Sequence, residues 1–280
     1  MKKLLITDLD NTLYDWVHFY STSFGAMLNE LVKITGISKE TLLDEFKIVH
    51  QKHGNIEYPY AALELPSLHT YFGSENKDVI KDEIDSALHA FNSARLKSLS
   101  CYSGVIDTLQ ELKSKGVKIV AHTEAPVRNS IVRIKKLKLD IFFSHLYAPK
   151  DKYQNELDER TKSWLGSFGD YVFFLDEIDR KPNPKLLLDI CKKEGVEPAD
   201  AVYVGDSIVK DISMANDAKI TSVWAEYGKQ HNPEYWKLLV SITHWTSEGV
   251  KKEEELKQAL KNVKPDYSIS NFSEIVKLFK

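Results

Sequence analysis

Short apolar segments that alternate with helical patterns constrain the fold of this chain more than any other feature. Each has the length of a buried strand, and most are separated by stretches with apolar residues three and four positions apart. The segments are KLLITDL (3–9), GVKIVAHT (116–123), IFFSHLYA (141–148), ADAVYVGD (199–206), AKITSVWA (218–225) and PDYSI (265–269). Strands that alternate with helices predict an α/β fold, a doubly wound parallel sheet with helices on both faces.

One long stretch interrupts this alternation. Residues 14–99 contain helical patterns and no convincing strand. We therefore expect an all-helical domain inserted after the first strand, and an α/β core formed by residues 1–13 and 100–280. Within that core, the segments 149–172 and 229–264 exceed the length of ordinary loops, and the sequence assigns them no role.

Composition excludes several classes of protein. The net charge of −3 offers no electrostatic basis for binding nucleic acid or an anionic membrane. No apolar stretch reaches the roughly 18 residues of a membrane span. The two cysteines, Cys101 and Cys191, form no CxxC pair, which predicts a cytoplasmic protein with reduced thiols. The sequence does not indicate an oligomeric state.

Two like charges end the first predicted strand. Asp8 and Asp10 in LLITDLDNTL are separated only by Leu9. They could form a solvated turn, because Asp and Asn commonly end strands. Alternatively, an extended backbone would aim both carboxylates at one place. Unit charges about 4 Å apart repel by roughly 4 kcal/mol at an effective dielectric of 20, so such a pair needs a counter-ion, a shifted pKa or free solvation.

Further polar residues follow other strands of the predicted sheet. Thr123 ends KIVAHT, Asp206 ends VYVGD, and Lys181 lies in the proline-rich segment RKPNPKLL. Each has an ordinary interpretation: a capping hydroxyl, a strand-end turn and a solvated lysine, respectively. In open α/β sheets, however, ligands bind outside the carboxyl ends of the strands. The sequence therefore predicts that Asp8, Thr123 and Asp206 meet at one edge.

Taken in order, four motifs make this chain resemble the haloacid dehalogenase superfamily of hydrolases. They read DLDNT, IVAHT, KPNP and GDSIVKD, where the family shows DxDxT, a strand ending in Ser or Thr, a lysine often within KPxP, and GDxxxxD. The resemblance implies a Rossmann-like core, and one branch of the family carries a helical cap directly after the first motif. LDNTLY is also similar, more weakly, to the first motif of pyrimidine-nucleotide phosphatases, and the chain as a whole to phosphoglycolate phosphatase-like members.

The resemblance implies a role for each motif residue. Asp8 would be the nucleophile that forms an aspartyl-phosphate, and Asp10 the general acid and then the base. Asp8, the backbone carbonyl of Asp10, and Asp206 would bind Mg²⁺. Thr123 and Lys181 would hold the phosphoryl oxygens of the substrate. In the same motifs, Asp211 more plausibly orients the metal site and Thr12 the loop after Asp10.

The expected activity is therefore Mg²⁺-dependent hydrolysis of a small phosphorylated metabolite, a nucleotide or a sugar phosphate among the options. Because the dehalogenase branch lacks the second aspartate, Asp10 favours a phosphate ester over a carbon–halogen bond. A phosphotransferase or mutase on the same scaffold, and a non-catalytic binding protein that kept the fold, remain as alternatives. Glu124 departs from the Asn that many family phosphatases have after the second-motif Thr.

Aromatic residues of the helical domain have two interpretations: they pack its own core, or they form a stacking wall for a base or sugar. These residues are Trp16, Phe19, Tyr20, Tyr58, Tyr60 and Tyr71.

Overall fold

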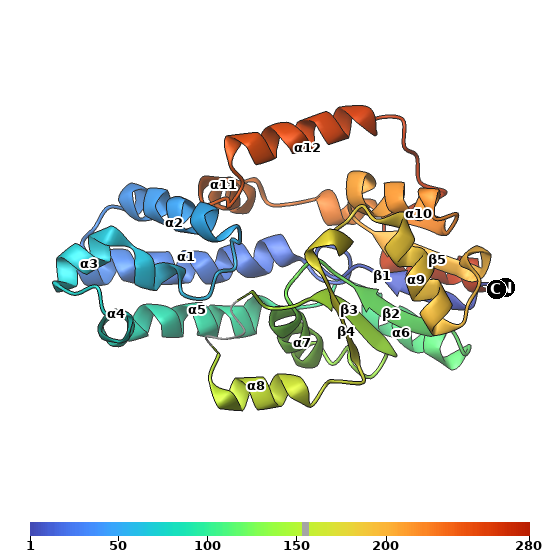
Figure 1. Cartoon of the computed structure of the whole chain (residues 1–280), viewed down its shortest axis with the longest axis horizontal. Coiled ribbons are helices and arrows are strands. Elements are labelled where there is room, and N and C mark those ends of the chain that lie inside the picture. Colours follow the sequence, from blue (N-terminus) through green and yellow to red (C-terminus); the bar gives the residue numbers. More distant parts are fainter. Residues whose placement is uncertain (153–156) are drawn as a thin grey trace. The chain divides into compact units, whose positions relative to one another are not determined.

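The computed structural model describes residues 1–152 and 157–280, which fold into two compact units (Figure 1). The α/β unit comprises Met1–Asp15, Ser100–Gln230 and Ala259–Lys280. The helical unit comprises Trp16–Leu99 and His231–Gln258. No described helix combines the length and the apolar character needed to cross a membrane.

A parallel sheet of seven strands forms the centre of the α/β unit, with the strand order β4-β3-β2-β1-β5-β6-β7. The predicted α/β fold is confirmed. The strands are β1 (Leu4–Thr7), β2 (Lys118–His122), β3 (His145–Pro149), β4 (Val172–Leu175), β5 (Ala201–Gly205), β6 (Thr221–Ala225) and β7 (Tyr267–Ile269). Only β4 is absent from the predicted set. It lies at an edge of the sheet, just after the long segment 149–172, of which residues 153–156 lie outside the described part of the chain.

Apolar residues on both faces of the sheet explain why it carries helices on both sides. Leu4 and Ile6 of β1 pack with α9 (Pro184–Glu194) and α10 (Ser213–Asp217) in one buried cluster. Leu5 points to the other face and is also fully buried. Other helices of this unit contact the strands and each other: α6 (Val105–Ser114) contacts β2 and η7 (Phe272–Phe279), and α7 (Val127–Lys136) contacts β3.

Short helical segments complete the α/β unit. They are α8 (Glu159–Gly166), η3 (Glu177–Asp179), η4 (Pro198–Asp200), the single-turn π-helix η5 (Ile208–Ile212) and η6 (Glu226–Lys229). Of these, η5 and η6 directly follow β5 and β6, so both lie at the carboxyl edge of the sheet.

The helical unit contains no strand among its described residues. Its elements are α1 (Trp16–Thr35), α2 (Lys39–His53), η1 (Ala61–Glu64), α3 (Pro66–Phe72), α4 (Lys77–Glu83), α5 (Asp85–Ser98), α11 (Pro233–Ser241) and α12 (Ser247–Ala259). Ser38 caps α2 by accepting a hydrogen bond from the backbone N–H of Thr41 at 3.1 Å. The Phe24 ring packs edge-on against Phe46, which joins α1 to α2.

The helical unit draws on a second stretch of the chain, which differs from the expected boundaries. The sequence placed residues 231–258 in the core, whereas they belong to the helical unit, in which α11 packs against α1 and α2. Ser21 Oγ donates to the carbonyl of Tyr235 at 3.2 Å, and His50 Nδ1 donates to the carbonyl of Ile242 at 2.8 Å. Burial lowers the pKa of His50 to about 4, so its ring is neutral at pH 7.

Several aromatic residues of this unit contact one another. Trp16 stacks on Tyr20 with ring centroids 5.2 Å apart, and the hydroxyl of Tyr20 donates to the carbonyl of Ile56. Tyr58 stacks on His53 with ring centroids 3.7 Å apart. These contacts agree with the packing interpretation for Tyr20 and Tyr58.

Candidate active site

The first motif forms a tight turn at the carboxyl end of β1. The backbone N–H of Asp8 donates to Val204 at 2.9 Å, which continues the ladder between β1 and β5 by one residue. Asn11 then adopts a left-handed conformation with φ 58°, and the chain turns back. The Thr12 hydroxyl donates to Asp8 Oδ2 at 3.3 Å, which fixes the Asp8 side chain at the edge of the sheet.

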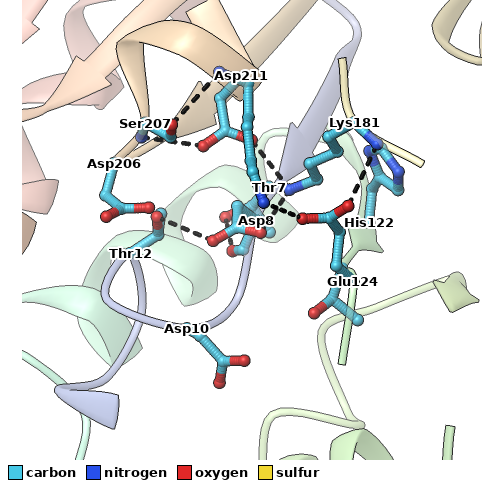
Figure 2. Close-up of polar contacts among 12 residues, drawn as sticks. Thr7, Asp8, Asp10, Thr12, His122, Glu124, Lys181, Asp206, Ser207 and Asp211 are labelled. Atoms are coloured by element: carbon cyan, nitrogen blue, oxygen red, sulfur yellow. Dashed lines mark hydrogen bonds and ion pairs between the residues drawn. The ribbon is translucent and has the colours of Figure 1, made fainter. Parts of the chain in front are cut away.

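Lys181 is buried between two carboxylates. Its Nζ donates to Asp8 Oδ1 at 2.5 Å and to Asp211 Oδ1 at 2.8 Å (Figure 2). Only 8% of the lysine is exposed. The residues that follow it begin α9, where Asn183 caps the helix and Pro184 occupies the first turn. Residues of the first, third and fourth motifs therefore lie in contact in the structure.

The fourth motif places Asp206 and Asp211 beside Asp8. Asp211 Oδ1 also accepts from the hydroxyl of Tyr203 at 3.0 Å, and its Oδ2 accepts from the backbone N–H of Ser207 at 3.0 Å. A Cβ at Gly205 would lie 2.4 Å from Asp211 Cγ, so only glycine allows this carboxylate to lie across the end of β5. One oxygen from each of Asp8, Asp206 and Asp211 lies within 4.8 Å of the others.

The electrostatics of this cluster reflect its burial. Burial raises the pKa of the Asp8 carboxyl well above its usual value; the charges of Asp211 and Asp206 add to the rise and that of Lys181 opposes it. Burial also raises the pKa of Asp206, against the opposing charge of Lys229. For Lys181, burial acts to lower the pKa, but the carboxylates of Asp211 and Asp8 outweigh it and raise the pKa well above its usual value. A strong positive charge close to these carboxylates would therefore stabilise their ionised forms.

The Asp10 carboxylate lies apart from this cluster. Figure 2 shows it pointing away from Asp8, and its Oδ1 and Oδ2 accept from Arg133 Nη1 at 3.0 and 3.4 Å. This differs from the expectation that Asp8 and Asp10 point the same way. That expectation assumed an extended backbone, whereas β1 ends at Thr7 and the chain turns at Asn11.

The second motif contributes a capped turn and a paired glutamate. Thr123 is buried, and its Oγ1 accepts from the backbone N–H of Ala125 at 3.1 Å, as a capping hydroxyl does. Glu124 accepts from the backbone N–H of Lys181 at 3.3 Å and from Lys210 Nζ at 2.7 Å. Lys210 therefore balances the negative charge of Glu124 close to the site.

Among the described residues, sequence reasoning missed three whose side chains contact the motif carboxylates: Tyr203, Lys229 and Arg133. Lys229 Nζ lies 3.0 Å from Asp206 Oδ2. The sequence carries no signal for Lys229, because only the fold brings its neighbour Gly228 so close to the first motif that a Cβ there would lie 2.1 Å from the carbonyl oxygen of Asn11. The signal for Arg133 was a charge between Ile131 and Ile134 on the buried side of α7.

Comparison with known proteins identifies the family. The model of the haloacid dehalogenase-like hydrolase family matches residues 2–219, which include every motif residue described above. The chain belongs to this family. The four motifs of this haloacid dehalogenase-like hydrolase all lie within the matched residues.

Curated relatives in the family are phosphatases. The chain is 25% identical to glyceraldehyde 3-phosphate phosphatase of Methanopyrus kandleri over 84% of its own length and 88% of the relative. It is 28% identical to phosphoglycolate phosphatase 1 of Pseudomonas aeruginosa over 82% of its own length and 72% of the relative. The predicted place in the phosphatase branch of the family is confirmed.

A solved structure agrees at the level of the fold. The 2-haloacid dehalogenase from Pseudomonas syringae pv. tomato is 18% identical, with a TM-score of 0.55, and the match covers 100% of this chain and 98% of that one. This likeness concerns the haloacid dehalogenase-like fold alone.

Proposed function

We propose that this hydrolase cleaves the phosphate monoester of a small metabolite, with Mg²⁺ as cofactor and an aspartyl-phosphate on Asp8 as intermediate. The observation that carries the proposal is the Asp8 carboxylate at the end of β1, in contact with Lys181 and beside Asp206 and Asp211. Phosphoryl transfer through a covalent intermediate needs a nucleophile, a cation for the phosphoryl oxygens and metal ligands. This arrangement offers candidates for all three.

The carboxylates fit a hard divalent cation, because oxygen ligands are what Mg²⁺ prefers. The two oxygens of Asp211 already accept from three protein donors, so we expect Asp211 to orient the site. Asp8, Asp206 and the backbone carbonyl of Asp10 would then hold the metal. When bound, Mg²⁺ neutralises charge on the phosphoryl oxygens.

In the first step, an oxygen of Asp8 forms a bond to phosphorus while the bond from phosphorus to the leaving oxygen breaks. Lys181 and Thr123 hold the phosphoryl oxygens that become more negative. Asp10 gives its proton to the leaving oxygen, so that an alcohol departs.

In the second step, water attacks the phosphorus of the aspartyl-phosphate. Its proton goes to Asp10, and the bond from phosphorus to Asp8 breaks to release inorganic phosphate. Asp8 is then a free carboxylate, and Asp10 carries the proton for the next leaving group. Net consumption is one water per ester.

The substrate class rests on the relatives, which by name act on glyceraldehyde 3-phosphate and phosphoglycolate. Because these relatives are named phosphatases, water is a better supported acceptor than a substrate hydroxyl. We assign substrate selection among small phosphorylated metabolites to the helical unit, because this unit begins four residues after Thr12 in the chain. The two cysteines outside any CxxC pair support a cytoplasmic location.

The test is Asp8→Asn, which keeps the size of the side chain and removes its attacking charge. We expect a fall in kcat of at least about 1,000-fold on both aryl and alkyl phosphates, as loss of a nucleophile causes elsewhere. Asp189→Asn is the control, because Asp189 is an exposed carboxylate on α9 paired with Lys185. Acid-quenched wild-type protein should gain the mass of one phosphoryl group during turnover with Mg²⁺. Near wild-type turnover by Asp8→Asn would refute the proposal.

A further inference from the structure

Arg133 is a buried charge that the proposed mechanism does not use. Its side chain is 4% exposed, although it carries a permanent positive charge. It lies on α7, the helix that follows the second motif, and its Nη1 contacts both oxygens of Asp10. A buried guanidinium is costly unless it is paired, so this position requires a reason.

The turn after Asp10 brings Tyr14 beside this ion pair. The backbone N–H of Asn11 donates to the carbonyl of Tyr14 at 2.8 Å, and Asp10 forms an isolated β-bridge with Tyr14. The Tyr14 side chain is fully buried. Burial raises the pKa of Tyr14, and the charge of Asp10 raises it further while that of Arg133 lowers it. All three side chains therefore lie within electrostatic reach of one another.

The ion pair holds Asp10 in an orientation in which it points away from Asp8 (Figure 2). The side chain of Asp10 is nevertheless 25% exposed, so one of its sides is open. To protonate a leaving oxygen near Asp8, the Asp10 carboxylate has to turn out of this orientation and later return to it. The contact with both oxygens of Asp10 fixes the position from which the carboxylate moves and to which it returns.

We propose that Arg133 is the positioning residue of Asp10, an inference that rests on the proposed function. It fixes the orientation from which the Asp10 carboxylate turns toward the leaving oxygen and to which it returns. Arg133 touches neither the substrate nor the reacting atoms in this role.

The test compares substrates that differ in their need for a proton. Aryl phosphates have good leaving groups that hardly need protonation, whereas alkyl phosphates depend on it. We expect Arg133→Met to lower kcat on an alkyl phosphate by about 10- to 100-fold, as misplacement of a catalytic group does. The loss on p-nitrophenyl phosphate should be several-fold smaller, and KM should change little. Arg133→Lys, which keeps the charge, should recover part of the alkyl activity.

Two further comparisons separate positioning from structural support. In the Asp10→Asn background, Arg133→Met should have little further effect, since residues that act through one another are not additive. This double variant also removes both charges, so it remains informative if Arg133→Met alone fails to fold. Lys136→Met is the matched control, because it removes an exposed charge from the same helix.

The outcomes distinguish this inference from the function on which it rests. Equal losses of Asp10→Asn on both substrates would contradict the acid role of Asp10 itself. Selective alkyl loss in Asp10→Asn, with an unselective loss in Arg133→Met or a full further loss in the double variant, would overturn the role of Arg133 alone.

Discussion

Lys229 shows how a single side chain at the site can oppose ligand binding. Its ammonium lies 3.0 Å from Asp206 Oδ2, and the lysine side chain is half exposed. A cation that takes this oxygen as a ligand has to displace the ammonium. Exposed ion pairs contribute little, about 0–1 kcal/mol, so the competition is modest and the lysine is free to swing into solvent.

We therefore expect Lys229→Met to bind Mg²⁺ about two- to fivefold more tightly, because 1 kcal/mol corresponds to roughly a fivefold change in affinity. Isothermal titration calorimetry without substrate measures this directly. Lys210→Met is the matched control: it also removes a positive charge near the site, but its partner is Glu124. An equal gain in both variants would mean that net charge, and not release of an Asp206 oxygen, sets the affinity.

At this scale, the motifs mark residues that lie near one another in the structure, but the sequence does not predict how their side chains are oriented. Asp8, Lys181 and Asp206 come together because strand ends and a proline-bounded loop fix their places, and the motifs mark those places. The orientation of Asp10 depends on the left-handed turn at Asn11 and on a partner 123 positions away. Neither follows from the local pattern, since the pairing with Arg133 exists only once α7 is packed.

The strands and helices were predicted well where apolar periodicity was bounded by turn residues. Strand β1 ends just before Asp8, and α9 is capped by Asn183 and Gly195, so their limits were visible in the sequence. Strand β4 was missed because VFFL follows an over-long segment and only two of its four residues are buried. An edge strand has a neighbour on one side only and lies at the margin of the core, so its side chains are less completely covered.

Glu64 connects several elements of the helical unit. Burial acts to raise its pKa, but hydrogen bonds from His53, Lys77, Lys52 and Tyr58 outweigh burial and lower the pKa well below its usual value. These donors come from α2, from α4 and from the segment before η1. A lowered folded-state pKa means that the stabilisation is present above the ordinary value of about 4.5 and is lost as pH falls through the folded-state value.

Glu64→Gln should lower the free energy of unfolding by about 1 kcal/mol at pH 7, a value discounted for the solvent exposure of both lysines. The difference between wild type and variant should shrink as pH falls below about 4.5, where the wild-type carboxylate begins to lose its charge advantage. Thermal melts from pH 7 to pH 3 measure it, with Glu75→Gln as the exposed control in the same unit. A pH-independent difference would show that shape, not charge, accounts for the effect.

The chain passes between the two units four times, at residues 15–16, 99–100, 230–231 and 258–259. The sequence did not predict the last two of these crossings between units. Residues 231–258 have ordinary helical periodicity, and no local sequence feature indicates which unit they pack against. Contacts such as Ser21 with Tyr235 decide it, and these join positions 214 residues apart.

Replacing His231–Gln258 with a ten-residue Gly/Ser linker should therefore destabilise the helical unit selectively. The replacement removes the backbone carbonyls that accept hydrogen bonds from Ser21 and His50. We expect faster proteolysis within residues 16–99, with Mg²⁺ binding by the α/β unit retained. The same linker inserted between Gln230 and His231, without deletion, is the control. Intact protease resistance of residues 16–99 would show that α11 and α12 are dispensable to that unit.

The central position of β1 also has a consequence for the order in which a nascent chain can fold. Strand β1 is made before its neighbours β2 and β5, which begin only at residues 118 and 201. During synthesis at about 5–20 residues per second, this apolar strand waits on the order of ten seconds or more for its second partner. The aspartates beyond it are thus made long before the ribosome has delivered the lysine and carboxylates that surround them. Chaperone binding to the emerging first strand would protect it through that interval.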